Sequence, residues 1–183
     1  DARLATADAV IVSDYGKGFV DQSLVERILL KRSSPSVIVA LDPKPRRRLN
    51  HKGVDLLTPN RSEALELAHL DKEDHAFFPA ELICAAIHEL YGPRYLAITL
   101  GSEGMLLSEG GEMGETIPTA AREVFDVSGA GDTVIASLAL ALAAGASFRD
   151  AAVLANAAAG LVVGKVGTAT ADSEEILTYL GEA

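Results

Sequence analysis

The sequence predicts an α/β fold with a mostly parallel sheet and a short antiparallel edge. Up to about residue 100, short runs rich in Val, Ile and Leu alternate with helical stretches. This is the pattern of buried parallel strands joined by crossover helices. Beyond that point, short strand-like runs are separated by glycine-rich turns, which is typical of antiparallel pairing.

Four apolar runs are predicted parallel strands, at 9–12, 37–41, 54–57 and 95–99. Helices are predicted over 20–31 with Asp21 as N-cap, from Asn60 or Ser62 to residue 70, and over 79–91, where Gly92 and Pro93 end it. Each strand ends in polar or glycine-rich residues. Because ligands bind beyond the carboxyl ends of parallel strands, we expect one shared site there.

The second half predicts edge strands at 104–108, 115–118 and 123–125. Two alanine-rich helices follow, roughly 130–144 and 148–163. Both are apolar on nearly every face, so we expect them to be deeply packed. A last short helix is predicted over 173–180.

Composition limits the possible partners and setting. With 183 residues the chain fits one domain, and its net charge of −10 argues against binding to nucleic acid or to anionic membranes. The longest apolar stretch, 134–146, is too short to span a bilayer, and no signal peptide is visible. A single cysteine, Cys84, excludes an internal disulfide and fits a reduced, cytoplasmic setting as a small core residue. The four histidines show no metal-ligand spacing and are interpreted as surface or packing residues: His51, His69, His75 and His88.

The segment Asp126–Thr133 (DVSGAGDT) carries the strongest functional signal. Its glycines let backbone amides crowd together, and a helix N-terminus adds unpaired donors, which suits an anion. In the structural interpretation, Asp132 caps the helix. In the functional one, the loop amides hold a phosphoryl group and Asp132 takes a hydroxyl proton, while Asp126 ligates a cation or ties down the loop.

Two further motifs also allow two interpretations. Asn60 and Glu63 have the spacing of a capping box, which is favoured on local grounds, or they organise a hydrated Mg²⁺ that accompanies ATP. The segment 99–104 (TLGSEG) is either a hairpin turn or a loop that lets a nucleotide approach the backbone closely.

The remaining candidates are basic or small residues. The run 44–48 (KPRRR) is expected to be a solvated face, except that Lys44 follows a strand and could reach a sugar phosphate, as could Lys17. Asn156 and Gly160 lie within a predicted helix, either for close packing or as a flat surface for adenine.

Taken together, these segments resemble the ribokinase-like (PfkB) carbohydrate kinase family. The order N-x-x-E at 60–63, T-x-G-x-x-G at 99–104 and D-x-x-G-A-G-D at 126–132 is the order of that family. More narrowly, the segments 13–18, 41–44, 57–60 and 156–168 resemble its heptose 7-phosphate kinase branch. The resemblance covers nearly all of the chain and implies a three-layer α/β/α fold.

The resemblance also implies roles for individual residues. Asp132 would be the base that deprotonates the anomeric hydroxyl of the sugar, and the amides of Gly129, Ala130 and Gly131 would form the anion hole. The remaining implied sites are Mg²⁺ at Glu63 with Asn60; ATP at Thr99, Gly101, Gly104, Asn156 and Gly160; a monovalent cation such as K⁺ at Asp126, Ser128, Val162 and Gly167; and the sugar phosphate at Asp14, Lys17 and Lys44.

The implied activity is ATP-dependent phosphorylation of D-glycero-D-manno-heptose 7-phosphate for lipopolysaccharide-precursor synthesis. Aligned with the family, residues 1–183 form the C-terminal portion of one kinase domain, without the first strands, the Gly-Gly sugar-binding motif or the β-lid through which the full-length parent would form a homodimer. Two alternatives stay open. One is an inactive adenine-nucleotide-binding module, and the other is a kinase of the same family for another sugar, such as fructose phosphate, or for a nucleoside.

Overall fold

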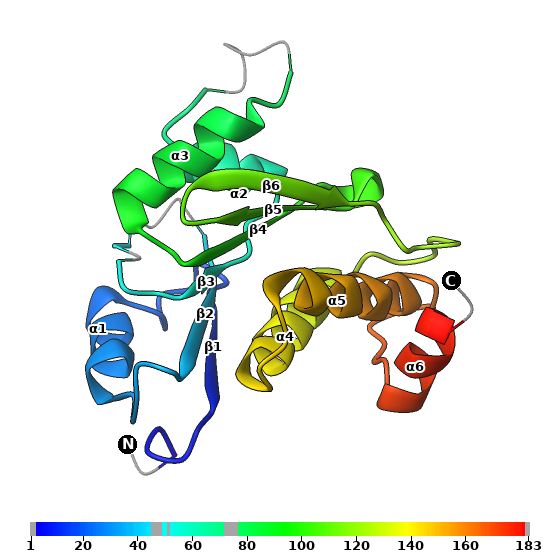
Figure 1. The fold of residues 1–183 in the computed structure, drawn as a ribbon, viewed down its shortest axis with the longest axis horizontal. Coiled ribbons are helices and arrows are strands. Elements are labelled where there is room, and N and C mark those ends of the chain that lie inside the picture. Colours follow the sequence, from blue (N-terminus) through cyan, green and yellow to red (C-terminus); the bar gives the residue numbers. More distant parts are fainter. Residues whose placement is uncertain (1–2, 45–48, 51, 72–76, 182–183) are drawn as a thin grey trace.

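The computed structural model describes residues 3–44, 49–50, 52–71 and 77–181. They form a six-stranded sheet whose strands follow one another in chain order, β1 to β6 (Figure 1). The predicted basic face 45–48 and the histidines His51 and His75 lie outside the described residues.

The sheet is parallel in its first four strands and antiparallel at the end, as predicted. β1 (Ala9–Ser13), β2 (Ile38–Asp42), β3 (Leu56–Leu57) and β4 (Tyr95–Thr99) run parallel, whereas β5 (Met105–Glu109) and β6 (Glu112–Ile117) pair antiparallel. Ser13 pairs with Asp42, and Asn60 forms an isolated bridge with Thr99. The carboxyl ends of β1 to β4 therefore share one edge of the sheet.

Helices cover both faces of the sheet and give the expected three-layer α/β/α fold (Figure 1). On one face, α1 (Gln22–Lys31), α2 (Arg61–Leu67) and α3 (Ala80–Tyr91) bury a core that includes Cys84, as expected. On the other, α4 (Ala130–Ala143) and α5 (Phe148–Val163) bury a second core, and α6 (Ser173–Gly181) packs on α5. No helix in the described residues has the length and apolar character needed to cross a bilayer.

Local sequence signals explain where the helices of the first layer begin and end. The Asp21 side chain accepts the Leu24 amide at 2.8 Å and so caps α1, as predicted. α3 ends at Gly92, whose φ of 63° lies in the left-handed region that glycine adopts without strain.

The predicted strand at 123–125 is wrong. Its side chains are largely exposed, with Val124 62% and Phe125 64% accessible. The Phe125 amide donates at 2.8 Å to the carbonyl of Val163 at the end of α5, so the segment is held by a helix terminus and not by a neighbouring strand. The expectation that α4 is packed all round also fails at Leu140, which is 71% exposed because α4 is covered only by the sheet and α5.

Two glycines around the 3₁₀ turn η3 (Gly101–Glu103) differ in their surroundings. Gly101 has φ of +64°, and an added Cβ would meet nothing within 4 Å. Gly104 has φ of +97°, and its Cβ would lie 2.0 Å from the carbonyl oxygen of Ile117. The Gly104 backbone therefore packs directly against the segment that follows β6.

We expect Gly104→Ala to lower the free energy of unfolding by about 3 kcal/mol or more, because both φ and the overlap oppose a side chain. The matched Gly101→Ala should cost about 1 kcal/mol, from φ alone. Urea unfolding followed by circular dichroism checks the pair. Equal losses for the two variants would contradict the assigned contact.

Candidate functional site

The shared edge of the sheet brings together the residues that the strand-end motifs predicted. α4 packs across β1 and β2, which places its first turn beside the carboxyl ends of those strands. Side chains from the ends of β1 and β2, from the residues that follow these two strands, and from the first turns of α2 and α4 meet here: Ser13, Tyr15, Asp42, Lys44, Glu63 and Asp132.

Asp132 is exposed and points toward the end of β1. Its Oδ1 accepts the Ser13 hydroxyl at 3.2 Å, and its Oδ2 accepts the Tyr15 hydroxyl at 2.8 Å. The N-cap of α4 is Gly129, and no side chain caps this helix. The structure thus does not support the cap interpretation of Asp132. Ser13 and Tyr15 lie within the strand-end segment 13–18, but no local pattern in the sequence identifies them as partners of Asp132.

The loop before α4 presents backbone to open space. Gly129 adopts φ of 84°, and its carbonyl accepts the Thr133 hydroxyl at 2.9 Å. The Ala130 amide donates to the Val127 carbonyl at 3.2 Å, so this predicted anion donor already has a partner within the turn. At Gly131, an added Cβ would meet nothing within 4 Å. A ligand can therefore approach the backbone at Gly131 without obstruction.

Acidic side chains dominate the charge of this edge. Burial raises the pKa of Asp42 to about 6; Lys44 opposes this shift, and the carboxylates of Glu63, Asp132 and Asp14 add to it. Lys44 Nζ lies 2.5 Å from Glu63 Oε1. Burial disfavours the charged ammonium, but the contact with Glu63 and the field of Asp42 outweigh it and raise the pKa of Lys44. Among the described residues, Lys44 is therefore the cation that opposes the charge of these carboxylates.

Asn60 and Glu63 form the capping box that local spacing favoured. Asn60 Oδ1 accepts the amides of Ser62 and Glu63 at 2.9 and 3.0 Å, and Glu63 Oε2 accepts the Asn60 amide at 2.9 Å. With Lys44 on Oε1, both carboxylate oxygens of Glu63 are engaged. Within the described part of the chain, no group of three or more His, Cys, Asp or Glu is placed to hold a metal ion.

Asp14 and Lys17, the two sugar-phosphate candidates in the loop after β1, differ in their exposure to solvent. Asp14 is only 2% exposed; its Oδ1 accepts the Gly16 amide at 2.7 Å, and its buried Oδ2 has no hydrogen-bond partner among the described residues. Lys17 is exposed. Asp14 therefore turns inward and fixes the loop that carries Tyr15.

The predicted nucleotide residues lie on two elements. Thr99 ends β4 beside Asn60, and Gly101 follows it at the same edge. On α5, Asn156 Nδ2 donates to the Pro118 carbonyl at 2.7 Å, and a Cβ at Gly160 would lie 3.0 Å from the backbone of Ala120. Both α5 residues therefore let the chain after β6 pack closely on the helix, which is the packing interpretation.

The predicted monovalent-cation residues are partly brought together. Asp126 Oδ1 accepts the Ser128 amide at 2.9 Å. This hydrogen bond lowers the pKa of Asp126, and hydrogen bonds from the Ser128 hydroxyl and the Gly167 amide add to the effect. The Val162 carbonyl instead accepts the amides of Gly164 and Lys165 at the end of α5.

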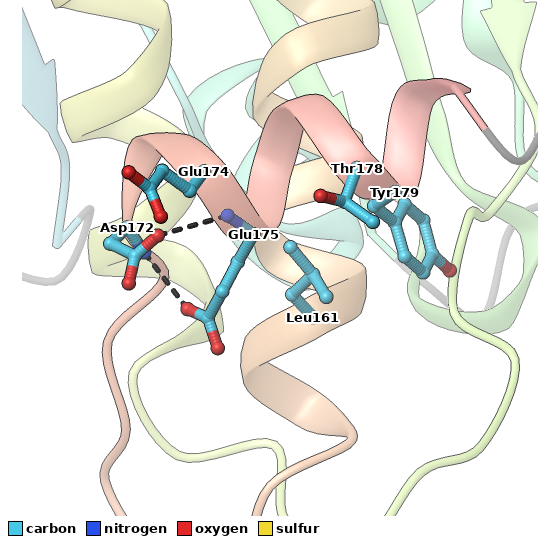
Figure 2. Close-up of a pocket in the computed structure, with 6 residues that line it drawn as sticks. All are labelled: Leu161, Asp172, Glu174, Glu175, Thr178 and Tyr179. Atoms are coloured by element: carbon cyan, nitrogen blue, oxygen red, sulfur yellow. Dashed lines mark hydrogen bonds between the residues drawn. The ribbon is translucent and has the colours of Figure 1, made fainter.

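A pocket of about 390 Å³ lies between α5 and α6, away from Asp132 (Figure 2). Its lining holds none of the predicted site residues: Leu161, Asp172, Glu174, Glu175, Thr178 and Tyr179. Asp172 and Glu175 exchange hydrogen bonds of 2.9 and 3.0 Å with each other's amides, and Glu175 pairs with Lys165 at 2.6 Å. These acids therefore serve to begin α6 and tie it down.

The raised pKa of Asp42 predicts a specific dependence of stability on pH. The folded state holds its proton up to about pH 6 and the unfolded state only up to about 3.8, so folding stability falls as pH rises through this window. Because the side chain keeps some water contact, we expect Asp42→Asn to raise the free energy of unfolding at pH 7.5 by about 1–2 kcal/mol.

The gain in the free energy of unfolding of Asp42→Asn should shrink as pH falls from 6 to below 4. Urea unfolding at each pH measures it. Asp8→Asn, at an exposed acid, controls for the general effect of removing one negative charge. A gain for Asp42→Asn that does not change with pH would contradict the raised pKa.

Comparison with known proteins agrees with this fold. Residues 3–176 match the pfkB family of carbohydrate kinases. The chain is 45% identical over 180 residues to the Bifunctional protein HldE of Desulfatibacillum aliphaticivorans, covering 97% of this chain and 36% of that protein. The HldE of Wolinella succinogenes is 42% identical over 179 residues, covering 98% and 37%.

Two solved ribokinases share the fold. The ribokinase of Thermotoga maritima matches with a TM-score of 0.80 at 25% identity, and the match covers 98% of this chain and 59% of the ribokinase chain. That of Arabidopsis thaliana, complexed with ribose and ATP, has a TM-score of 0.80 at 26% identity and covers 97% and 57%. The chain thus spans a little over a third of these curated relatives and somewhat over half of these ribokinases. With its ribokinase-like α/β fold, the chain belongs to the pfkB family of carbohydrate kinases.

Proposed function

We propose that the complete protein transfers the γ-phosphoryl group of ATP to the anomeric hydroxyl of a heptose 7-phosphate. Membership of the pfkB family supports a sugar acceptor, and the similar Arabidopsis ribokinase is complexed with ribose and ATP. The choice of a heptose phosphate rests on the strand-end segments 13–18, 41–44 and 57–60. As one step of lipopolysaccharide-precursor synthesis, the reaction would take place in the cytoplasm.

The observation that carries the proposal is the carboxylate of Asp132. It is exposed at the meeting point of α4 and β1, it caps no helix, and two hydroxyls orient it. As general base, Asp132 accepts the proton of the sugar hydroxyl. The hydroxyl oxygen then forms a bond to the γ-phosphorus of ATP, the bond from that phosphorus to the bridging oxygen breaks, and ADP leaves.

Gly131 supports an anion site in front of Asp132. It lies in the first turn of α4, where glycine costs about 1 kcal/mol relative to alanine. Neither a positive φ nor a close neighbour explains this glycine, because a Cβ there would meet open space. A ligand that needs the backbone bare explains it. Together with Gly129, and with Ala130 if its turn opens, this loop would hold the developing charge of the phosphoryl group.

The acids near Asp42 fit a divalent cation by chemistry, since Mg²⁺ prefers carboxylate oxygens and water. When bound, Mg²⁺ supplies positive charge against the phosphates of ATP. Glu63, with Asn60, is the residue proposed to hold its hydration shell. For ATP we propose Thr99 and Gly101 at the strand-end edge, while Gly104, Asn156 and Gly160 would shape that side through their packing. For K⁺ we propose Asp126, Ser128 and Gly167, since the Val162 carbonyl already accepts two amides.

Lys44 and Lys17 are proposed for the sugar phosphate. Lys44 is held by Glu63 beside Asp42, so its ammonium stays charged at the strand ends. Asp14, which the sequence analysis grouped with them, is buried and would act through the loop it fixes.

Asp132→Asn should lower kcat by at least about 100-fold in the complete natural polypeptide, because the amide cannot take the proton. Coupled release of ADP measures it, with heptose 7-phosphate compared against fructose phosphate and a nucleoside. Asp150→Asn is the matched control, since Asp150 also lies in the first turn of a helix, α5, and accepts the Ser147 hydroxyl. Turnover of Asp132→Asn within a few-fold of wild type would exclude this base.

Gly131→Ala should separate stability from activity. The new methyl meets open space and favours the helix, so the free energy of unfolding should rise by about 0.5–1 kcal/mol. The same methyl should obstruct the phosphate, so kcat/KM should fall by about 10-fold or more. Urea unfolding and steady-state kinetics test the two halves. A variant that gains stability and keeps full activity would contradict the anion site.

A further inference from the structure

Two hydroxyl groups hold the carboxylate of Asp132 from positions 119 and 117 residues earlier in the chain. Ser13 belongs to β1, and its hydroxyl reaches Oδ1 at 3.2 Å. Tyr15 lies two residues further on and reaches Oδ2 at 2.8 Å. Each oxygen of the carboxylate therefore accepts one hydrogen bond, so the rotation of the group about its own axis is restrained.

The loop that carries Tyr15 is itself fixed. Asp14 is buried and accepts the Gly16 amide at 2.7 Å, which closes a tight turn around Tyr15. Gly16 adopts φ of 68°, which lets the chain turn back directly after Tyr15. The Tyr15 ring remains 63% exposed, so core packing contributes little to its placement. The hydroxyl contact with Asp132 is the specific interaction that explains why a tyrosine points here.

We propose that Tyr15 and Ser13 are positioning residues that hold the Asp132 carboxylate in one orientation toward the acceptor hydroxyl. The inference rests on the proposed function of Asp132 as the base. A hydrogen bond to a charged acceptor is stronger than one between neutral groups, so the two hydroxyls hold the orientation of the carboxylate firmly. Neither hydroxyl takes part in proton or phosphoryl transfer.

The test compares Tyr15→Phe with wild type in the complete natural polypeptide. Loss of the hydroxyl frees Asp132 Oδ2, and kcat should fall by about 10-fold, since small errors in positioning are costly. KM for ATP should stay within two-fold, because Tyr15 is not among the residues proposed to bind ATP. Tyr91→Phe is the matched control: it removes a hydroxyl that lies 3.4 Å from the Leu67 carbonyl in the helical layer on the opposite face.

Ser13 gives an independent variant pair. Ser13→Ala should lower kcat about three-fold, a smaller effect because its hydrogen bond is longer. Ser13→Thr keeps the hydroxyl on a residue suited to a strand and should restore most of that loss. Equal losses for Ala and Thr would show that packing in β1, and not the hydroxyl, is responsible, and would overturn the role of Ser13.

A double-mutant cycle separates positioning from a general structural effect. In the Asp132→Asn background, measured in single turnovers with enzyme in excess, Tyr15→Phe should slow phosphoryl transfer no further. A 10-fold loss in both backgrounds, or none in wild type, would overturn the inference while leaving the base intact. If Asp132→Asn alone retained near wild-type turnover, the proposed function itself would fail, which is a distinct outcome.

Discussion

The contact between the first turn of α4 and the carboxyl end of β1 is the constraint on which the site depends. Four parallel strands bring their polar ends to one edge, but the acids at those ends, Asp14 and Asp42, are buried or partly buried, whereas Asp132 is exposed. α4 crosses β1 and β2 on the second face of the sheet and adds this carboxylate. Without that crossing, the strand ends would lack the exposed carboxylate that we propose as the base.

The buried acid Asp42 weighs against the stability of the fold at neutral pH. Burial raises its pKa, the carboxylates of Glu63, Asp132 and Asp14 add to the shift, and Lys44 opposes it. A fold selected for stability alone would replace Asp42 with a neutral residue. The retention of Asp42 agrees with the divalent cation that we propose at this edge.

Local signals predicted the elements better than the contacts between them. The apolar run Tyr95–Thr99 and the helix Phe148–Val163 were predicted to the residue, because period and turn residues define them locally. The run at 123–125 shows the same strand-like composition, but no strand among the described residues pairs with it, and the carbonyl of Val163 at the end of α5 accepts the Phe125 amide. The pairing of Tyr15 with Asp132 depends on where α4 crosses the sheet, which no local pattern encodes.

The glycines show how structural and functional roles can be told apart within one motif set. Gly104 and Gly160 belong to the predicted nucleotide motifs, yet a Cβ at Gly104 would lie 2.0 Å from neighbouring backbone, and one at Gly160 would make a tight contact of 3.0 Å. Their presence therefore says little about a ligand. Gly131 has ordinary helical geometry and open space around it, so the fold alone would favour alanine. Gly131 lowers the stability of its own helix, and no close contact requires it there. We interpret it as a position kept free for a ligand, one residue before Asp132.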